Sequence, residues 1–396
     1  MNFFKELKMS LSNNIRDYGM YIALAVITVF FSITTNGLFI SPNNIFNIII
    51  QTGYIGVMAV GMTLVIVIRH IDLSVGSILG FASAICAVLM LTTGINSILA
   101  LVVALVFGMI AGIITGWLVA RVGIPAFVAS LAGMFIYRGA MLMVLGANGG
   151  AAVGFKSDFI DAVGNGAIPR LFEIGPLAGS TVILGLILII LNVWVQLKNR
   201  KIQLNYGFKV ESSLLFILKV VSISTFIAVF TMQLALGRGF PVTLIILAIV
   251  VGIYHFVTTK TVLGRHIYSV GGNPEAAELS GIDVKKITLI VFASMGMLAG
   301  LAGFMYAARL NSATLTAGRG LELFAIAGAF VGGVSAAGGV GKVTGSVIGA
   351  LVIMSLSNGM QMMSIPTDIK DIVIGTVLVL AVVFDIKTRN IKKKAL

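Results

Sequence analysis

The sequence predicts an all-α integral membrane protein, a bundle of about 12 membrane-spanning helices. Of its 396 residues, 58% are hydrophobic and only 10% are charged. Water-soluble domains usually have about 45–50% apolar and about 25% charged residues. A helix uses roughly 20 residues to cross a hydrocarbon core of about 30 Å, so about a dozen helices use most of the chain. No room remains for a sizeable soluble domain, and the long apolar runs exclude a barrel of alternating strands.

The first apolar run follows an amphipathic segment, residues 1–18, that contains Lys5, Lys8 and Arg16. This region lacks a small-residue cleavage site, so we interpret it as an uncleaved first span and not as a removed signal peptide. The remaining apolar runs are separated by short polar segments. The predicted spans are residues 20–35, 44–68, 75–93, 96–120, 125–146, 177–197, 213–235, 239–258, 287–308, 321–337, 343–363 and 370–386.

Lysine and arginine positions predict that both termini face the cytoplasm, because positively charged loops are retained on that side. Most of the 27 basic residues then fall in inward segments, among them the loop at 259–286 and the basic tail at 387–396. The loop at 146–176 is placed outside. The formal charge of +13 is therefore an orientation signal. The basic residues are not gathered on one polar face, so we expect no nucleic-acid partner.

Enzymatic chemistry is poorly supported by the sequence. Cys86 is the only cysteine, and the three histidines stand far apart, so we expect no metal site and no disulfide. The glycine-rich segment before Lys342 imitates a phosphate-binding loop, but Val343 follows the lysine where a serine or threonine is required. We therefore expect no catalytic residues and no cofactor bound by this chain.

Two carboxylates stand where the sequence predicts helix ends. Asp72 precedes Ser74 and Gly76, an arrangement that ends one helix and caps the next. Glu322 opens a glycine-rich run, where a carboxylate in the first turn stabilises a helix start. The alternative, a functional charge within the membrane, stays open for both residues.

Glycine makes up 46 of the residues, and many glycines stand four apart. Small residues at this spacing allow helix backbones to approach closely in lipid. Tight packing explains most of these pairs, although a movable gate could use the same surfaces. Examples are Gly108 and Gly112, Gly112 and Gly116, Gly328 and Gly332, and Gly345 and Gly349.

Uncharged polar residues within two runs are candidates for a solute pathway. Asn47, Gln51 and Tyr54 recur at helical intervals and share one face, and Asn358 and Gln361 do the same on a later helix. Side-chain amides both donate and accept hydrogen bonds, which suits a neutral, hydroxyl-rich solute. The competing interpretation is hydrogen bonding between helices.

The inner loop at 259–286 combines a turn with a short helix. Gly271, Gly272 and Asn273 are followed by a helical run that stops at Gly281. This pattern indicates a contact surface for another protein, the alternative being a solvated connector.

Three long strings resemble the permease subunits of ATP-driven bacterial monosaccharide importers, the ribose and xylose permease family. They are AVGMTLVIVIRHIDLSVGSILG at 59–80, IYSVGGNPEAAELSGIDVKK at 267–286, and the block at 307–363. The similarity covers nearly the whole chain. It implies a single transmembrane permease domain over residues 1–396, with a ten-span core and an extra helix pair within 177–235.

The resemblance also implies partners and a location. These are a second permease copy, cytoplasmic ATPase subunits that bind ATP and Mg, and an extracytoplasmic sugar-binding protein, in the lipid bilayer of the bacterial cell membrane. The inner loop matches the family's coupling segment. Its implied ATPase contacts are Gly271, Gly272, Asn273, Glu275, Ala276, Leu279, Ser280 and Gly281.

Three alternatives remain beside this interpretation. An ion-coupled secondary transporter would need carboxylates deep in the membrane, which are scarce here. An ATP-driven permease for an amino acid would favour charges facing the solute's carboxylate and ammonium groups. A membrane scaffold would show no solute dependence. Glucose, galactose, xylose, arabinose and ribose all suit a polar, uncharged pathway.

Overall fold

The computed structural model describes residues 15–148, 150, 152–208, 210 and 212–394. Most of the amphipathic segment predicted at 1–18 and the last two residues of the predicted tail lie outside this range. The described chain is mostly helical, as predicted. Its long helices are α2 (Ile15–Thr34), α3 (Pro42–Val67), α4 (Val75–Thr93), α5 (Ser97–Trp117), α6 (Ala126–Ala147), α8 (Gly179–Asn205), α9 (Ser213–Leu236), α10 (Val242–Lys260), α13 (Val284–Leu310), α15 (Val343–Met362) and α16 (Thr367–Lys394).

Short elements connect these helices. The strands form two antiparallel pairs. β1 pairs with β4, which is distant in the sequence, and β2 pairs with β3, which follows it directly. The short elements are η1 (Leu38–Ile40), η2 (Leu118–Val122), β1 (Ala152–Gly154), α7 (Asp158–Asn165), β2 (Glu173–Ile174), β3 (Leu177–Ala178), α11 (Val262–Gly272), α12 (Pro274–Leu279), β4 (Ser312–Thr314) and α14 (Leu321–Val331).

Nine helices within the described residues are long and apolar enough to cross a membrane, fewer than the 12 predicted spans. The clearest difference is α14, which covers only part of the predicted span at 321–337. Its 11 residues extend about 16 Å, roughly half of the hydrocarbon thickness. Gly332 ends the helix, and Gly333 has a positive φ of 88°. An apolar, glycine-rich run therefore does not form one continuous span.

Contacts divide the chain into two compact units, and the predicted single permease domain stays a prediction. Among the described residues, the larger unit contains 15–39, 48–165 and 243–394, and the smaller contains 40–47 and 166–242. The smaller unit includes α8 and α9, the extra helix pair predicted within 177–235.

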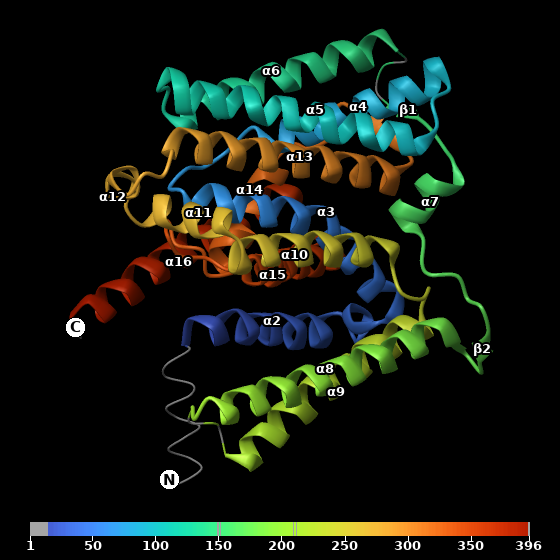
Figure 1. Ribbon diagram of the computed structural model, residues 1–396. Coiled ribbons are helices and arrows are strands. Elements are labelled where there is room, and N and C mark those ends of the chain that lie inside the picture. Colours follow the sequence, from blue (N-terminus) through green and yellow to red (C-terminus); the bar gives the residue numbers. More distant parts are fainter. Residues whose placement is uncertain (1–14, 149, 151, 209, 211, 395–396) are drawn as a thin grey trace. The chain divides into compact units, whose positions relative to one another are not determined.

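In the larger unit, α13 packs against α5 and α4, and α4 packs in turn against α6 (Figure 1). Elsewhere in the same unit, α14 packs against α15 and α16, and α15 packs against α2. The most apolar stretch of α3 is completely buried, so this helix belongs to the core. Thr63 of α3 donates a 2.5 Å hydrogen bond to Ser346 of α15, which joins the two helices inside the apolar core.

Glycines allow α5 and α13 to pack backbone against backbone. A Cβ atom at Gly112 would collide with the carbonyl oxygen of Phe292, and one at Gly296 would collide with that of Gly108. The same arrangement recurs where Gly349 of α15 meets Gly328 of α14. Tight packing is thus the observed role of these glycines, in agreement with small-residue contacts between membrane helices.

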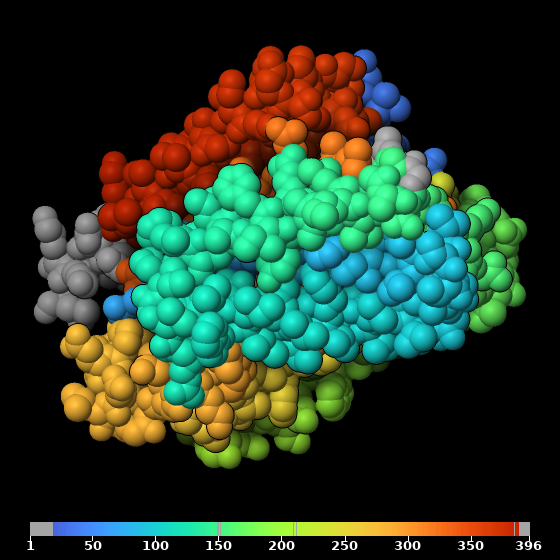
Figure 2. Space-filling view, turned by 90° about the horizontal axis from the view of Figure 1, so that it is seen from above, coloured from blue at the N-terminus to red at the C-terminus, as the bar shows by residue number. Residues whose placement is uncertain are grey.

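Figure 2 shows the face of the larger unit that is formed by α5 and α6. Large apolar side chains are exposed along this face, including Ile110, Ile114, Phe135 and Ile136. In a membrane protein such a surface contacts lipid or another helical subunit.

The smaller unit is built around the hairpin of α8 and α9. Asn192 donates a 3.1 Å hydrogen bond to Ser224 across the hairpin, and Gly185 lies against Thr231. At its other end, the backbone N–H of Phe240 donates a 3.1 Å bond to the hydroxyl of Thr181. These contacts hold the two helices together along their length.

Candidate functional site

The helix α12 forms a small, well-capped projection. Asn273 accepts a 3.2 Å hydrogen bond from the backbone N–H of Ala276 through its Oδ1 atom, which caps the helix start. Pro274 occupies the first turn, where its missing N–H is not needed. Gly281 has a φ of 84°, a conformation that favours glycine and ends the turn after Ser280. The local sequence therefore specifies a rigid turn of helix.

One side of α12 is anchored and the other is open. Ala277 is buried, whereas the side chain of Leu279 is 91% exposed. A leucine held almost fully in the open on a rigid turn is suited to enter a pocket of another protein. The remaining predicted coupling residues Gly272, Asn273, Glu275, Ala276, Ser280 and Gly281 are also exposed, and Gly271 is buried.

Arg69 ties this projection to the membrane core. Its Nε atom donates a 2.7 Å hydrogen bond to the carbonyl oxygen of Gly271, and its Nη2 atom donates to that of Gly272. A guanidinium that bridges two adjacent carbonyls fixes their orientation as well as their position. Arg69 itself has a positive φ of 66°, a conformation that bulky residues rarely adopt.

A third segment, residues 332–342, meets the ends of α3 and α11 next to α12. We call this meeting point the Arg69 junction. The backbone N–H of Gly339 donates a 2.9 Å bond to the carbonyl oxygen of Val67, and Tyr268 donates a 2.6 Å bond to Gly341. A Cβ atom at Gly271 would collide with the carbonyl oxygen of Val67, so only glycine fits there. Burial raises the pKa of Tyr268, which keeps its hydroxyl a donor. The ends of α3 and α11 and the segment at 332–342 thus meet at one point.

Asp72 lies in the break between α3 and α4. Its Oδ1 atom accepts hydrogen bonds from the backbone N–H of Ser74 at 2.9 Å and from the Ser74 hydroxyl at 2.6 Å. The Oδ2 atom is buried and makes no hydrogen bond to any residue that the structure describes. Burial raises the pKa of Asp72, while the two bonds from Ser74 oppose the shift.

A second break lies between α13 and α14, and the two breaks touch. Gly76 and Gly80 at the start of α4 pack against the backbone of Gly318 and Ala317. Glu322, in the first turn of α14, lies beside Gly76. The starts of α4 and α14 therefore lie next to each other within the larger unit. In transporters, the starts of discontinuous helices often contribute to the site that binds the solute.

The predicted pathway residues are divided between buried and exposed positions. Gln51, Tyr54 and Asn358 are buried, whereas Asn47 and Gln361 are exposed. The hydroxyl of Tyr54 accepts a 3.0 Å hydrogen bond from Nη1 of Arg309 on α13. Tyr54 thus has a charged partner that the sequence pattern did not indicate.

Asn358 occupies a different environment. It is buried on α15 next to Gly359, against which the ring of Phe31 from α2 packs. The burial of Asn358 fits an interhelical role as well as a pathway role.

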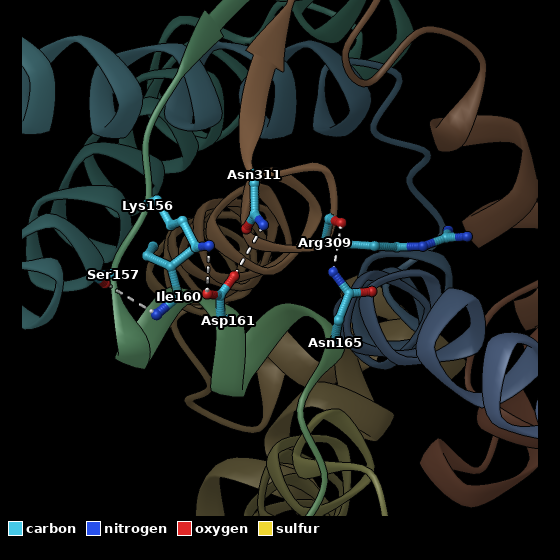
Figure 3. Close-up of polar contacts among 7 residues, drawn as sticks. All are labelled: Lys156, Ser157, Ile160, Asp161, Asn165, Arg309 and Asn311. Atoms are coloured by element: carbon cyan, nitrogen blue, oxygen red, sulfur yellow. Dashed lines mark hydrogen bonds and ion pairs between the residues drawn. The ribbon is translucent and has the colours of Figure 1, made fainter. Parts of the chain in front are cut away.

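Figure 3 shows a polar latch between α7 and the end of α13. Asp161 accepts a 2.9 Å hydrogen bond from Asn311 and lies 4.0 Å from the ammonium group of Lys156. Asn165 donates a 2.8 Å bond to the carbonyl oxygen of Arg309. In Figure 1, α7 and α12 lie at opposite ends of the larger unit, so this latch is remote from the Arg69 junction.

Sequence reasoning did not find Arg69, Arg309 and Asn311. Arg69 stands in the string at 59–80, but its partners Gly271 and Gly272 are some 200 residues away, as the two hydrogen bonds show. Helical periodicity reports which face a residue occupies and carries no information on a partner at that separation. The only local signal was an arginine directly after an apolar run.

The comparisons with known proteins agree along most of the chain. Residues 44–382 match the family described as branched-chain amino acid transport system / permease component. The xylose transport system permease protein XylH of Haemophilus influenzae is 38% identical over 382 residues, covering 96% of this chain and 98% of that protein. No solved structure matches the chain significantly.

Two further relatives extend the comparison. XylH of Escherichia coli K12 is 36% identical over 381 residues, covering 96% of this chain and 94% of that protein. The ribose import permease protein RbsC of the same strain is 34% identical over 368 residues, covering 92% of each chain.

Proposed function

Because the chain belongs to the branched-chain amino acid transport system / permease component family, we propose that it is the membrane permease of an ATP-driven monosaccharide importer. It resides in the bacterial cell membrane and moves a neutral sugar inward, with xylose or a similar pentose as the first candidate. The observation that carries the proposal is the exposed α12 turn, mounted on a membrane bundle that is similar to xylose permeases over 96% of its length.

The cargo proposal rests on the sugars that the similar permeases transport. The full-length relatives named above transport xylose or ribose. Both are neutral sugars that present several hydroxyl groups. Amide and phenol side chains such as Gln51, Tyr54 and Asn358 can donate to and accept from hydroxyls. An amino acid would additionally bring a carboxylate and an ammonium group into the membrane, each with a large desolvation cost.

The ATPase contact is proposed at α12. Leu279 would enter a pocket on a cytoplasmic ATPase subunit, surrounded by the polar rim of Asn273, Glu275 and Ser280. ATP and Mg would be bound by that partner and not by this chain. The exposure of these side chains supports the assignment.

A path for mechanical coupling leads from α12 into the membrane. Movement of α12 would pull on Gly271 and Gly272, and through them on Arg69. Arg69 precedes Asp72 and the start of α4 by a few residues, so the movement would reach the two helix breaks. Rearrangement at Gly76 and Gly318 would then alternate access to the sugar.

A second permease copy would complete the pathway. The exposed apolar surface of α5 and α6 offers area for a helical partner. At the opposite end of the larger unit, the α7 latch would form part of the docking site for an extracytoplasmic sugar-binding protein. Both termini would then lie on the cytoplasmic side with α12, since the start of α2, the end of α16 and the turn α12 share one end of this unit (Figure 1).

A branched-chain amino acid is the second candidate cargo, because the matching family carries that description. The two are separated by reconstituting the permease with its ATPase and binding protein and measuring ATP hydrolysis. Stimulation by xylose or ribose, with no response to leucine, supports a sugar importer. Stimulation by leucine alone would refute it, and ATP hydrolysis that ignores every solute would refute both.

A further inference from the structure

The side chains of the α8–α9 hairpin change from apolar to basic at the same distance along both helices, near the turn that joins them. Residues 179–197 of α8 and residues 220–236 of α9 contain no ionisable side chain. At 1.5 Å per residue these stretches are about 28 Å and 25 Å long, close to the hydrocarbon thickness of a bilayer. Lys198, Arg200 and Lys219 therefore stand at the depth of the lipid headgroups.

A cavity of about 280 Å³ opens between the two helices at this level. Two cationic side chains and three amides line it, together with an aromatic ring. Guanidinium, ammonium and amide groups all donate hydrogen bonds to phosphate oxygens. The volume equals that of roughly nine water molecules, enough for a phosphate group. The lining includes Gln196, Asn199, Arg200, Gln203, Phe216 and Lys219.

Arg200 is held in place but not saturated with hydrogen bonds. Its Nη2 atom donates a 3.3 Å bond to the Ser213 hydroxyl, and the guanidinium carbon lies 4.5 Å from the centre of the Phe216 ring. The Nη1 atom is buried and makes no hydrogen bond to any described residue. A buried N–H group that lacks an acceptor costs free energy, which an anionic oxygen would recover.

The start of α9 adds to the positive electrostatic potential in the cavity. Ser213 begins this helix beside Arg200, so the positive end of the helix dipole lies at the cavity. Between residues 198 and 219 the sequence has five basic residues and one acidic residue, Glu211. Glu211 and one of the lysines lie outside the described residues.

The surrounding surface is that of a membrane interface. Trp194 is 57% exposed, and the ammonium group of Lys198 lies 4.8 Å from the centre of its ring. Tryptophan and lysine are common at this depth in membrane proteins. Ile190 and Leu197 are exposed on the apolar side of the same helix.

From this geometry we propose that the cavity binds the phosphodiester headgroup of an anionic phospholipid. The phosphate oxygens accept hydrogen bonds from Arg200 and the neighbouring amides, and the acyl chains extend along the exposed apolar residues of the hairpin. A free phosphate ion offers the same chemistry without the chains. The lipid is favoured because the cavity borders the exposed apolar residues Ile190 and Leu197, along which acyl chains can lie. The proposal does not depend on the nature of the transported solute.

Native mass spectrometry of the delipidated full-length chain tests the proposal, with phosphatidylglycerol and phosphatidylcholine as probes. The wild type should retain phosphatidylglycerol in preference to phosphatidylcholine, and millimolar inorganic phosphate should not displace it. Arg200→Gln should weaken phosphatidylglycerol binding about tenfold, since it removes a charge-assisted contact. Lys198→Gln is the matched control, because it removes a cation from the same helix outside the cavity.

Three results would overturn the proposal. They are equal retention of both lipids by the wild type, equal losses in Arg200→Gln and Lys198→Gln, and displacement of the lipid by free phosphate. The wild-type comparison requires no variant, so it remains decisive if a substitution impairs folding. Lys219→Gln supplies a second change in the cavity, with the same expected loss.

Discussion

Arg69 donates a 2.7 Å hydrogen bond from Nε to the carbonyl oxygen of Gly271, across 202 positions of the chain. This contact joins the end of a buried membrane helix to the exposed turn α12. The membrane core and the proposed ATPase contact therefore form a continuous hydrogen-bonded unit.

Arg69→Gln should separate ATP hydrolysis from transport. Glutamine cannot bridge the two carbonyls, so α12 would still bind the ATPase but would transmit less of its movement. We expect uptake to fall about tenfold while ATPase association is retained, the size expected from losing one charge-assisted hydrogen bond. The measurements are solute uptake and co-purification of the ATPase.

Lys285→Gln is the matched control for Arg69, because Lys285 is an exposed cation in the first turn of α13. Its uptake should equal that of the wild type. Normal uptake in Arg69→Gln would remove Arg69 from the coupling path.

Leu279→Asp should abolish ATPase association without unfolding the permease. Leu279 is 91% exposed, so its replacement leaves the fold intact, but it places a charge where an apolar pocket is expected. Co-purification of the ATPase measures the effect. Leu171→Asp, at a position 80% exposed in the smaller unit, is the control and should leave association unchanged. An undiminished complex with Leu279→Asp would argue against the α12 contact.

Gly112→Ala should destabilise the bundle by about 1–3 kcal/mol, the usual cost of overpacking. The new methyl group would meet the Phe292 carbonyl, which belongs to the backbone and cannot rotate away. Gly139→Ala is the control, since nothing lies within 4 Å of its Cβ position. That change should be neutral or stabilising because alanine favours helix. Thermal unfolding in detergent compares the two variants. Equal melting temperatures would contradict the close packing of α5 against α13.

Asp72→Asn should preserve the fold, whereas Asp72→Ala should cost about 1 kcal/mol through loss of the hydrogen bonds from Ser74. Asparagine retains an oxygen that can accept both bonds from Ser74. Burial raises the pKa of the Asp72 carboxyl, so folding favours its protonated form. Its contribution to stability is therefore present below the unfolded pKa and is lost as pH rises through the folded pKa.

The pH dependence of unfolding checks this prediction. Above the unfolded pKa, the wild type should lose stability with rising pH more steeply than Asp72→Asn. Parallel curves for the two proteins would show that Asp72 does not titrate on folding.

Tyr54→Phe should lower uptake several-fold while leaving ATPase association unchanged. The change removes only the hydroxyl that accepts from Arg309, so the packing of the ring against Tyr306 is retained. Tyr21→Phe, on the exposed side of α2, is the control for loss of a phenol. Loss of assembly in Tyr54→Phe, instead of loss of uptake, would favour a structural role.

The sequence predicted the helices much better than it predicted their relationships. Apolar length and the start and stop residues placed α4, α5, α6 and α9 within a few residues of their observed ends. The turn and the short helix α12 were also predicted, because both depend on local sequence. The sequence could not show that a predicted span would shorten to α14, since glycine-rich apolar runs form spans and breaks alike.

The candidate site was predicted in its exposed part and missed in its buried part. Six of the seven predicted coupling residues beside Leu279 share its exposure, but the anchor at Arg69 depends on a contact between distant segments. Tyr54 was singled out as polar, while its partner Arg309 lies 255 positions away. Contacts at such separations arise only when the helices pack.

The most direct test is uptake of labelled xylose into proteoliposomes that contain the permease and its ATPase, with the sugar-binding protein outside. The account predicts accumulation that requires ATP at the ATPase, survives uncouplers of ion gradients, and is lost in Leu279→Asp. Uptake that proceeds without the ATPase and collapses with an uncoupler would contradict it.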